Sequence, residues 1–485
     1  MSSEFTFIDS VLVAIIAIVS LYVRLWTIER PSDVIFDEVH FGNFSKWYNT
    51  KYFHFDIHPP LAKLIMAYIA KSAQYKGDIQ RFYKLGIPYE KNETHYITQR
   101  YIPAIFSAGV APLIYCSLRN FAVSPICALL GSIMLALDSS MIVESKFILT
   151  DGILHFFTAL HIFAFSLFLR TEDNFHVLLA GITLGCASSC KFTALGLFAL
   201  DGISQIFWIL IKRPDIVAII SRATLLLAPA AFVFFFSFVL HFALCPFAGK
   251  NAHYLEGPDK NTVFDFNKVN TSYWGNRLIN SPLLLRTYRW IKVMHRINFR
   301  SNIPHPWQSY PEYWPFMTDK QILFYSKESH RRITCTGLPA SYWPSTAGVI
   351  LVPFLFLIRF ADWRDLLFTF GWAVSYFPFI MVPRTMFNYH YLIPLEFACA
   401  NFGILIENVF SRRNSMRGFA ATFFIITVIL CYWFFCPIVY GTFAKDAINA
   451  RRWLHQWNDG FKPALKYFNR VMYKTALMRT QLPKY

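Results

Sequence analysis

Two adjacent carboxylates, Asp37 and Glu38, stand in the segment that follows the first apolar run of the chain. On a helix, neighbouring side chains point about 100° apart, so the two cannot both face one substrate atom. The spacing therefore predicts a division of labour, in which one carboxylate accepts a proton from an incoming hydroxyl while the other orients the acceptor or pairs with a cation. A purely structural interpretation stays open, because the backbone dipole also favours acidic residues in the first turn of a helix.

Further ionisable residues stand where apolar runs begin. Arg100 opens the second run, Lys146 and Asp151 flank the start of the fourth, and Arg384 and His390 lie where the ninth meets the tenth. An ionisable group at the entrance to a bilayer is costly unless it is paired or hydrated. Because different helices bring these residues to one face of the membrane, the pattern predicts a shared aqueous groove there.

The elements that must position these residues are membrane helices. The chain has 485 residues, 55% of them hydrophobic, 18% aromatic and only 15% charged, which excludes a disordered or collagen-like chain. Apolar runs long enough to span a bilayer predict an all-α polytopic membrane protein with about eleven transmembrane helices. The predicted spans are 11–28, 101–118, 122–141, 149–169, 176–192, 193–211, 223–246, 346–360, 364–382, 389–407 and 418–440.

Basic residues in the short loops predict the orientation, because Lys and Arg are retained on the cytoplasmic side. With a cytoplasmic N-terminus and a lumenal C-terminus, most short loops obey this rule, and the sequons at Asn43, Asn92 and Asn270 fall on the opposite side. Three cations break the rule and are candidates for an anionic ligand, although they could also snorkel to the interface. They are Lys146, Lys191 and Arg384.

The chain divides into two membrane regions and three lumenal pieces. Residues 1–246 form an N-terminal membrane region that includes the lumenal loop 29–99, and its first run is interpreted as a retained anchor. A lumenal loop over 247–345, a second membrane region over 346–441 and a basic lumenal tail over 442–485 follow. The basic residues of the tail indicate a surface that is either solvated or bound to lipid headgroups, and no nucleic-acid partner is expected. Cys245 and Cys335 flank the large loop and could form a disulfide.

The chain resembles the protein O-mannosyltransferases, integral membrane enzymes of the GT-C glycosyltransferase class. The matching motifs follow the family's order along nearly the whole chain, and the 247–345 loop is too short for the MIR domain that typical eukaryotic members insert there. Ala62, Lys146 and Leu338 depart from the usual Gly, Arg and Asn. The motifs are Asp37-Glu38-Val39-His40-Phe41, His58-Pro59-Pro60-Leu61-Ala62-Lys63, Arg100, Glu144 to Asp151, His305-Pro306-Trp307-Gln308-Ser309, Tyr313-Trp314-Pro315, Arg384 with Asn388 to Leu392, and Arg452 to Trp457.

The resemblance implies an activity: transfer of mannose from dolichyl phosphate mannose to Ser or Thr hydroxyls of proteins in the endoplasmic reticulum, with inversion at C1. It implies Asp37 as the base with Glu38 in support, no metal or other cofactor, and a homodimer or heterodimer with a related transferase. Arg100 and Arg384 would hold the donor phosphate, because a guanidinium grips phosphate oxygens in bidentate fashion. Further candidates for phosphate binding are Lys146, His58 and His390, and other candidate site residues are Asp151, His305, Trp307 and Trp314.

Three other functions remain open on the sequence. The first is a GT-C transferase that uses a polyprenyl phosphate sugar to extend a lipid-linked glycan. The second is a transporter or channel in which Asp37, Asp151 and Arg100 form an ion relay, although the Gly/Pro-broken repeats that would support it are absent from the sequence. The third is a catalytically silent partner subunit.

Overall fold

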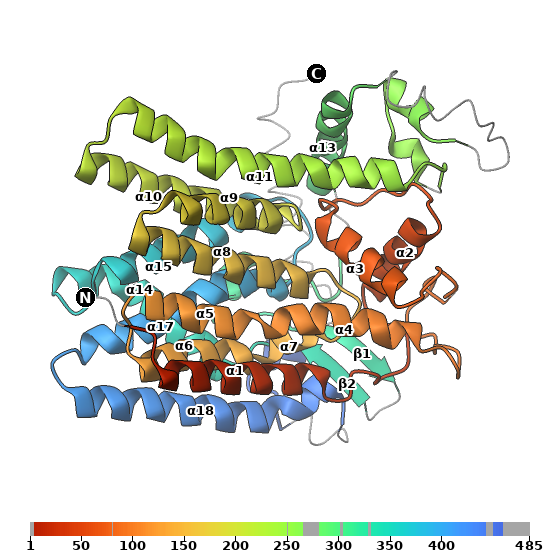
Figure 1. Ribbon diagram of the computed structural model, residues 1–485. Coiled ribbons are helices and arrows are strands. Elements are labelled where there is room, and N and C mark those ends of the chain that lie inside the picture. Colours follow the sequence, from red (N-terminus) through yellow and green to blue (C-terminus); the bar gives the residue numbers. More distant parts are fainter. Residues whose placement is uncertain are drawn as a thin grey trace.

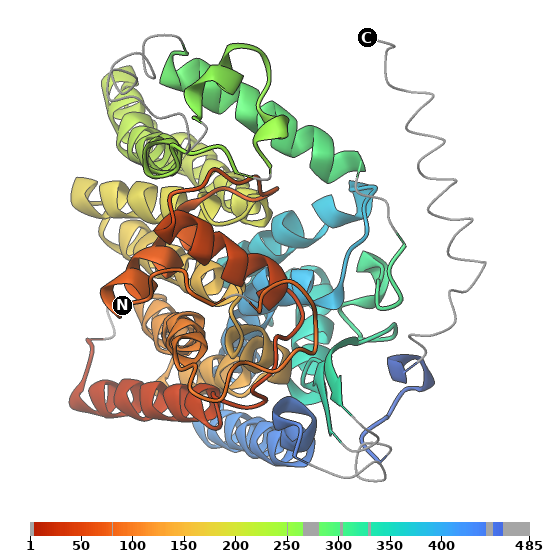
Figure 2. The ribbon, with the colours of Figure 1, turned by 90° about the vertical axis from the view of Figure 1, so that its right-hand side faces the viewer.

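The long helices of the molecule lie side by side along one direction, with shorter elements gathered at one end (Figure 1). The structure is a computed structural model that describes residues 4–79, 81–249, 251–264, 281–300, 304–327, 331–442 and 450–458. We call the end that carries the shorter elements the loop end, and Figure 2 views the molecule onto it. Its elements are α2 (Glu38–Asn49), α3 (Leu61–Ser72), α13 (Leu283–Arg300), β1 (Ile322–Lys327) and β2 (Arg331–Cys335).

Eight helices of the described residues are long and apolar enough to cross a membrane. Some of them are made of two consecutive helical elements. They are α1 (Phe7–Leu25), α4 (His95–Ala108) with α5 (Val110–Asn120), α8 (Asp151–Thr171), η1 (Phe192–Leu195) with α10 (Gly196–Lys212), α11 (Ile216–Leu244), α14 (Pro339–Leu357), η6 (Asn388–Tyr391) with α17 (Leu392–Val409), and α18 (Asn414–Tyr440).

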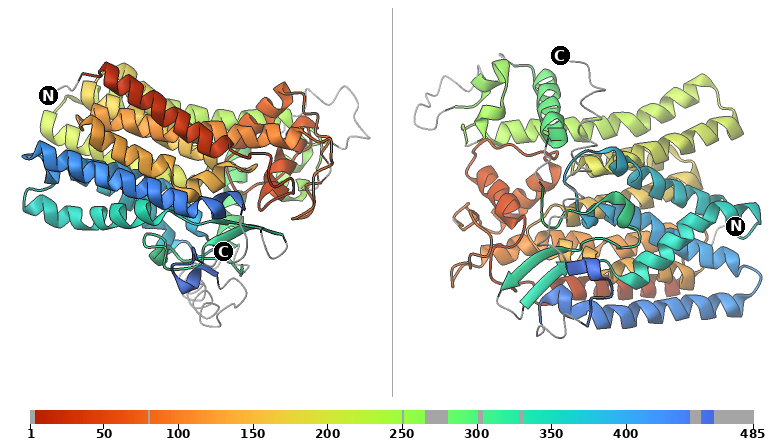
Figure 3. Two further views of the ribbon diagram at one scale, coloured as in Figure 1. Left: turned by 90° about the horizontal axis from the view of Figure 1, so that it is seen from below. Right: turned by 180° about the vertical axis from the view of Figure 1, so that it is seen from behind.

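The other three predicted spans coincide with shorter or bent helices. One is a pair, α6 (Pro125–Ala136) and α7 (Ser139–Ser145), which bends by 53° and counts as a ninth span if it crosses the membrane as one. The others are α9 (Asn174–Ser188), and α15 (Trp363–Tyr376) with α16 (Pro378–Met381). The membrane architecture predicted from the apolar runs is therefore confirmed, and α10 and α11 form one edge of the bundle while α1 and α18 form the other (Figures 1 and 3).

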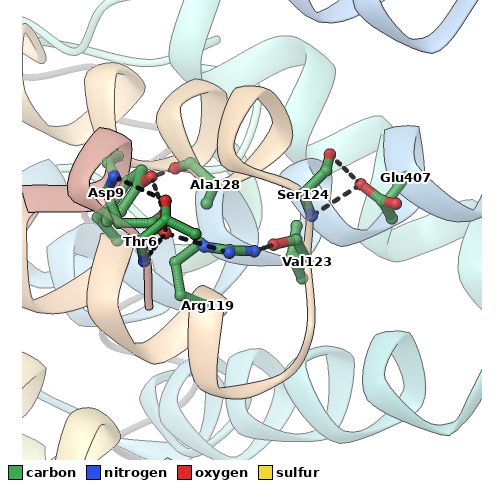
Figure 4. Close-up of polar contacts among 9 residues, drawn as sticks. Thr6, Asp9, Arg119, Val123, Ser124, Ala128 and Glu407 are labelled. Carbon is green, nitrogen blue, oxygen red and sulfur yellow. Dashed lines mark hydrogen bonds and ion pairs between the residues drawn. The ribbon is translucent and has the colours of Figure 1, made fainter. Parts of the chain in front are cut away.

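The end of the bundle opposite the loop end, where α1 begins, is held by paired charges; we call it the N-terminal end. Thr6 and Asp9 form a capping box that satisfies the first backbone N–H groups of α1. The same Asp9 carboxylate accepts hydrogen bonds from Arg119 Nε at 2.6 Å and from the Tyr115 hydroxyl at 2.7 Å. Figure 4 shows this cluster beside a second contact, in which the backbone N–H of Ser124, the N-cap residue of α6, donates to the carboxylate of Glu407 in α17. These contacts join α1, α5, α6 and α17.

The first turn of α8 lies directly against α4 at the loop end. A Cβ atom added to Gly152 would lie 2.4 Å from the carbonyl oxygen of Pro103, so a larger residue could not fit without moving one helix. This close approach fixes Asp151, the first residue of α8, beside the elements of the loop end.

The segments assigned to the lumen, together with Cys245 beside them, differ from the sequence-based expectations in three respects. β1 and β2 pair antiparallel as a hairpin, which the apolar runs did not predict. The disulfide considered for Cys245 and Cys335 does not form. Asn43 lies inside α2 with its side-chain amide donating to Val39 and Phe82, which leaves its sequon unsuited to glycosylation. Short 3-10 helices complete the described loops: η2 (Ala252–Tyr254), η3 (Gly257–Thr262), η5 (Pro311–Tyr313) and η7 (His455–Asn458).

The segments assigned to the lumen lie together at the loop end as far as they are described (Figure 1). That this end faces the lumen stays a prediction, as do the domain boundaries. The sequon at Asn270 and most of the basic tail lie outside the described residues.

Candidate active site

Asp37 occupies the N-cap position of α2, yet its side chain makes no capping hydrogen bond. The carboxylate is half-buried, and no hydrogen bond to it is found among the described residues. Burial raises the pKa of Asp37, although the positive charges of His40 and Lys191 oppose the shift. Asp37 is thus a partly exposed carboxylate that is poised to take up a proton.

The backbone before Asp37 is held in an uncommon conformation. Phe36 has a φ of 44°, which is rare for a bulky residue and persists only where the surroundings impose it. Its ring stacks on Phe324 of β1 at 4.3 Å between centroids and meets Phe387 and Tyr389 edge-on. The hairpin and the segment before α17 therefore fix the direction in which α2 begins, and with it the position of Asp37.

Glu38 points to the other side and is fully buried in a hydrogen-bonded pair with Arg100 of α4. Arg100 donates to it from Nε at 2.7 Å and from Nη2 at 3.0 Å, and Tyr89 and the backbone of Ile35 and Ile148 donate as well. Glu38 thus pairs with a cation, as one of the predicted roles requires, whereas Asp37 forms no ion pair among the described residues. That Asp37 accepts a proton from a hydroxyl stays a prediction.

The expectation that Arg100 holds the donor phosphate is corrected by the same contacts. Arg100 is 0% exposed, and its remaining N–H groups donate to the carbonyls of Ile28, Pro31 and Asp33. A guanidinium enclosed in this way joins the start of α2 to α4 and has no face left for a ligand.

Lys146 is likewise placed away from Asp37. Its ammonium donates to the carbonyl of Trp26 at the end of α1 and lies 4.5 Å from the ring centre of Tyr440 in α18. The side chain is 1% exposed, and burial lowers its pKa to about 7. Its position argues against phosphate binding and for a role in joining α1, α7 and α18.

An ion pair between Lys191 and Asp151 lies beside Asp37. Lys191 Nζ is 2.7 and 2.8 Å from the two carboxylate oxygens of Asp151, and both side chains are 6% exposed. Lys191 Nζ also lies 5.7 Å from the ring centre of Tyr389, and the charges of Lys191 and Asp151 both act on Asp37. Among the cations that break the loop rule, Lys191 is therefore the one at the centre of this cluster.

The turn that carries His58 closes one side of the cluster. Lys63 of α3 pairs with Asp56 and donates to the carbonyls of His58 and Pro59, so the turn is tied to the first turn of α3. The N–H of Leu61 donates to the carbonyl of Ser189 at 3.0 Å, which joins α3 to the segment before Lys191.

His58 itself is half-buried and close to several cations. Burial and the charges of Lys191, Lys63 and Arg384 hold its pKa well below the ordinary value of 6.5. At neutral pH it is therefore uncharged and can donate or accept a hydrogen bond without adding charge.

Arg384 and His390 come from the segment that leads into α17. Arg384 is half-buried, and burial lowers its pKa while Tyr389, Asp56 and Asp37 partly offset the shift. His390 is half-buried with its ring stacked between Tyr389, at 4.6 Å, and Trp314, at 5.9 Å.

The two tryptophans and His305 have more peripheral places. Trp314, a candidate site residue, is 1% exposed with its indole N–H donating to Ser309, so it has no face open to a ligand and supports His390 instead. Trp307 is partly buried against the hydrophobic core. His305 is exposed and touches Phe387 edge-on, three residues from His390.

The structure thus gathers half-buried charged and polar residues around the Lys191–Asp151 pair. Asp37 is a carboxylate with a raised pKa, and Arg384, Lys191 and two histidines offer positive charge or N–H donors. The described residues contain no group of three or more His, Cys, Asp or Glu that could hold a metal ion. Such a site suits a hydroxyl nucleophile and a substrate with an anionic leaving group.

The chain matches two models of known protein families. Residues 14–250 match the family model "Dolichyl-phosphate-mannose-protein mannosyltransferase", and residues 288–457 match "C-terminal four TMM region of protein-O-mannosyltransferase". The chain belongs to the protein O-mannosyltransferase family. The first matched segment contains Asp37, His58, Asp151 and Lys191, and the second contains Arg384 and His390.

Relatives and a solved structure agree with this assignment. Dolichyl-phosphate-mannose–protein mannosyltransferase 4 of Candida albicans is 27% identical over 52% of this chain and 35% of its own length. Mannosyltransferase 1 of Saccharomyces cerevisiae is 31% identical over 57% of this chain and 35% of its own length. The chain thus matches only about a third of the length of these two curated relatives.

The fold match is more extensive. A chain of the S. cerevisiae protein O-mannosyltransferase Pmt1–Pmt2 complex bound to the sugar donor superposes with a TM-score of 0.84 and 18% identity, covering 97% of this chain and 96% of that one. The GT-C membrane fold implied by the resemblance is confirmed.

Several residues of the site gave no distinct signal in the sequence. Phe36 acts through its positive φ, which its residue type does not predict. Glu144 of α7 is buried near Asp151 and Lys191. His155 of α8 and Glu396 of α17 form a buried pair at 2.8 Å that joins two helices whose first turns carry site residues. An ionisable residue within an apolar run was the available signal for this pair.

Proposed function

We propose that this chain transfers mannose from dolichyl phosphate mannose to Ser or Thr hydroxyls of proteins, with inversion at C1. The observation that carries the proposal is the half-buried Asp37 carboxylate, which has no hydrogen-bond partner among the described residues and lies within the field of Lys191 and Arg384. The names of the relatives support the same donor and acceptor class.

Asp37 acts as the general base. The acceptor hydroxyl loses its proton to the carboxylate as its oxygen forms a bond to C1 of mannose, a contribution of roughly 10²–10⁴-fold to the rate. The raised pKa of Asp37 makes its carboxylate a stronger base, which takes the proton of the hydroxyl more readily.

The leaving group is the dolichyl phosphate, whose charge must be held as the C1–O bond breaks. The guanidinium of Arg384 interacts electrostatically with Asp37 and is only half-buried, so part of it is open to a ligand. Lys191 adds a second positive charge. His58 and His390 are placed to donate hydrogen bonds to the phosphate oxygens. Because the phosphate leaves as an anion, no general acid or divalent metal is required, and one displacement gives inversion.

The membrane fold and the distribution of basic residues in the short loops support a setting for the reaction. The loop end faces the lumen of the endoplasmic reticulum, the N-terminus is cytoplasmic, and the tail beyond the last span is lumenal. The solved relative is a complex of two transferases, and we propose that this chain also pairs with a related transferase.

The test is an assay of purified protein with radiolabelled dolichyl phosphate mannose and a Ser/Thr-rich peptide. Transfer to this peptide, none to the same peptide with every Ser and Thr replaced by Ala, and no effect of a metal chelator are expected. Label on a lipid-linked glycan in place of the peptide would support the alternative GT-C activity. No transfer to either acceptor would reject the proposal.

A further inference from the structure

Asn298, in the last turn of α13, bridges two segments of the candidate site. Its Nδ2 donates to the carbonyl oxygen of Ile57 at 2.9 Å, and its Oδ1 accepts from Nη1 of Arg384. Ile57 directly precedes His58, so one side chain of the large loop contacts both the turn that carries His58 and the guanidinium assigned to the phosphate.

The Arg384 side chain has little other support. Among the described residues its second hydrogen-bond partner is the carbonyl of the adjacent Thr385, which accepts from Nε at 3.2 Å. Thr385 is adjacent in the chain and moves together with Arg384, so its carbonyl cannot fix the guanidinium relative to the rest of the fold. Asn298 can do so, because it lies on a separate element of the fold.

The helix that carries Asn298 is itself held in place. Trp290, Val293 and Met294 of α13 are buried in a cluster with Phe53 and Phe242, which belong to the 50–55 segment and α11. α13 crosses the loop end of the bundle instead of continuing along a span (Figure 2). It therefore forms a platform from which Asn298 reaches the site.

The chemistry of the bridge requires an amide. An Asn side chain donates from nitrogen and accepts at oxygen, so it can satisfy a carbonyl and a guanidinium at once. An Asp side chain would accept from Arg384 but could not donate to Ile57, and its charge would compete with a phosphate. A Leu side chain of similar size would do neither.

We infer that Asn298 is a positioning residue for the donor: it orients Arg384 toward the lipid phosphate and fixes the His58 turn beside it. The inference rests on the proposed function and deepens it, because it makes α13 of the large loop part of the apparatus that binds the lipid-linked donor. Asn298 does not touch the reacting atoms.

The test compares Asn298→Leu and Asn298→Asp with wild type in steady-state transfer assays. Both variants are expected to raise KM for dolichyl phosphate mannose about tenfold, which corresponds to one hydrogen bond to a charged group. We expect kcat at saturating donor and KM for the peptide to stay within about twofold of wild type. Arg296→Ala is the matched control, because Arg296 lies on the same helix but pairs with Glu256 at the surface, at 2.7 Å.

A double-variant cycle separates positioning from a general loss of structure. If Asn298 acts through Arg384, Asn298→Leu combined with Arg384→Ala should have a donor KM within about twofold of Arg384→Ala alone. Any one of three results would overturn the inference. The effects of the two substitutions on the donor KM could multiply in the double variant, the donor KM of Asn298→Leu could be unchanged, or its kcat could fall together with its melting temperature.

Failure of the inference and failure of the proposed function are distinguishable. A wild-type enzyme that transfers mannose and an Arg384→Ala variant with weakened donor use, together with a normal Asn298→Leu variant, would reject only the role of Asn298. A wild-type protein that neither transfers mannose nor gains thermal stability from dolichyl phosphate would reject both.

Discussion

The charged clusters at the two ends of the bundle differ in how completely their charges are paired. At the N-terminal end, Asp9 is 0% exposed and receives hydrogen bonds from Arg119, Tyr115 and Thr6 (Figure 4). At the loop end, Asp37 is half-buried and has no hydrogen-bond partner among the described residues. A fully paired carboxylate joins the elements of the fold around it. An unpaired carboxylate beside fixed cations is held in place by the rest of the fold, and it is available for chemistry.

The same contrast recurs within two consecutive residues. Glu38 is enclosed by five hydrogen-bond donors, while its neighbour Asp37 has none among the described residues. The hydrogen bonds of Glu38 fix the start of α2, and this fixed start holds the neighbouring Asp37 in its position. Substitutions at the two sites should therefore separate stability from activity.

The largest effect is expected for Asp37→Asn. Loss of the base should lower kcat for mannosyl transfer by roughly 10²–10⁴-fold. Because burial opposes ionisation of Asp37, the neutral Asn should leave the melting temperature in detergent at pH 7 unchanged or slightly higher. Undiminished transfer by the variant would remove Asp37 from the mechanism.

Arg100→Met should have the opposite signature. It leaves the Glu38 carboxylate buried without its cation, which should reduce the free energy of unfolding by about 3–5 kcal/mol. A fall in the melting temperature and in the yield of folded protein measures this loss. The double variant with Glu38→Gln is the control, and it should recover part of the stability because no unpaired charge remains; a phosphate-binding Arg100 would instead raise the donor KM with normal stability.

Asp9→Asn should be a milder change at the other end of the bundle. The Asn side chain keeps an acceptor for the backbone of Thr6 but loses the charge that Arg119 faces, so we expect a loss of about 2 kcal/mol in unfolding free energy. Mannosyl transfer per folded molecule should equal that of wild type. A selective loss of activity without a change in melting temperature would break the comparison between the two ends.

The smallest effect concerns pH. A base must be ionised to act, and a raised pKa means that Asp37 takes up its proton at a higher pH than a free Asp, whose ordinary value is 3.8. The acid limb of kcat/KM should therefore have its midpoint above that value, with activity falling as pH decreases through it. Melting curves over the same pH range exclude unfolding as the cause, and a limb at or below pH 3.8 would contradict the assignment.

The sequence predicts the membrane fold well because apolar runs are a local property. All eleven predicted spans coincide with helices or helix pairs of the structure, and the shorter ones, such as α9, are those whose boundaries are hardest to read from composition. The hairpin at 322–335 was missed because its two strands lie in a polar loop without a long apolar alternation.

The roles of the candidate site residues were predicted less well than the positions of the spans. Asp37, Asp151, Arg384, His58 and His390 come together at the loop end, as expected for groups at the ends of neighbouring spans. Residue type could not distinguish Arg100 and Lys146 from them, because a cation that binds a ligand and one that binds a carboxylate or a carbonyl have the same sequence signature.

The sequence by itself determined the class of membrane fold, the family and the inventory of charged groups at the ends of the spans, since each depends on local composition or on motifs along the chain. Only the tertiary structure decided which of those charges are paired. Pairing depends on distances between side chains that are far apart in sequence: Glu38 with Arg100, Lys191 with Asp151, and Arg384 with Asn298. Those distances leave the Asp37 carboxylate without a pairing partner among the described residues, which is the reason that we propose it as the base.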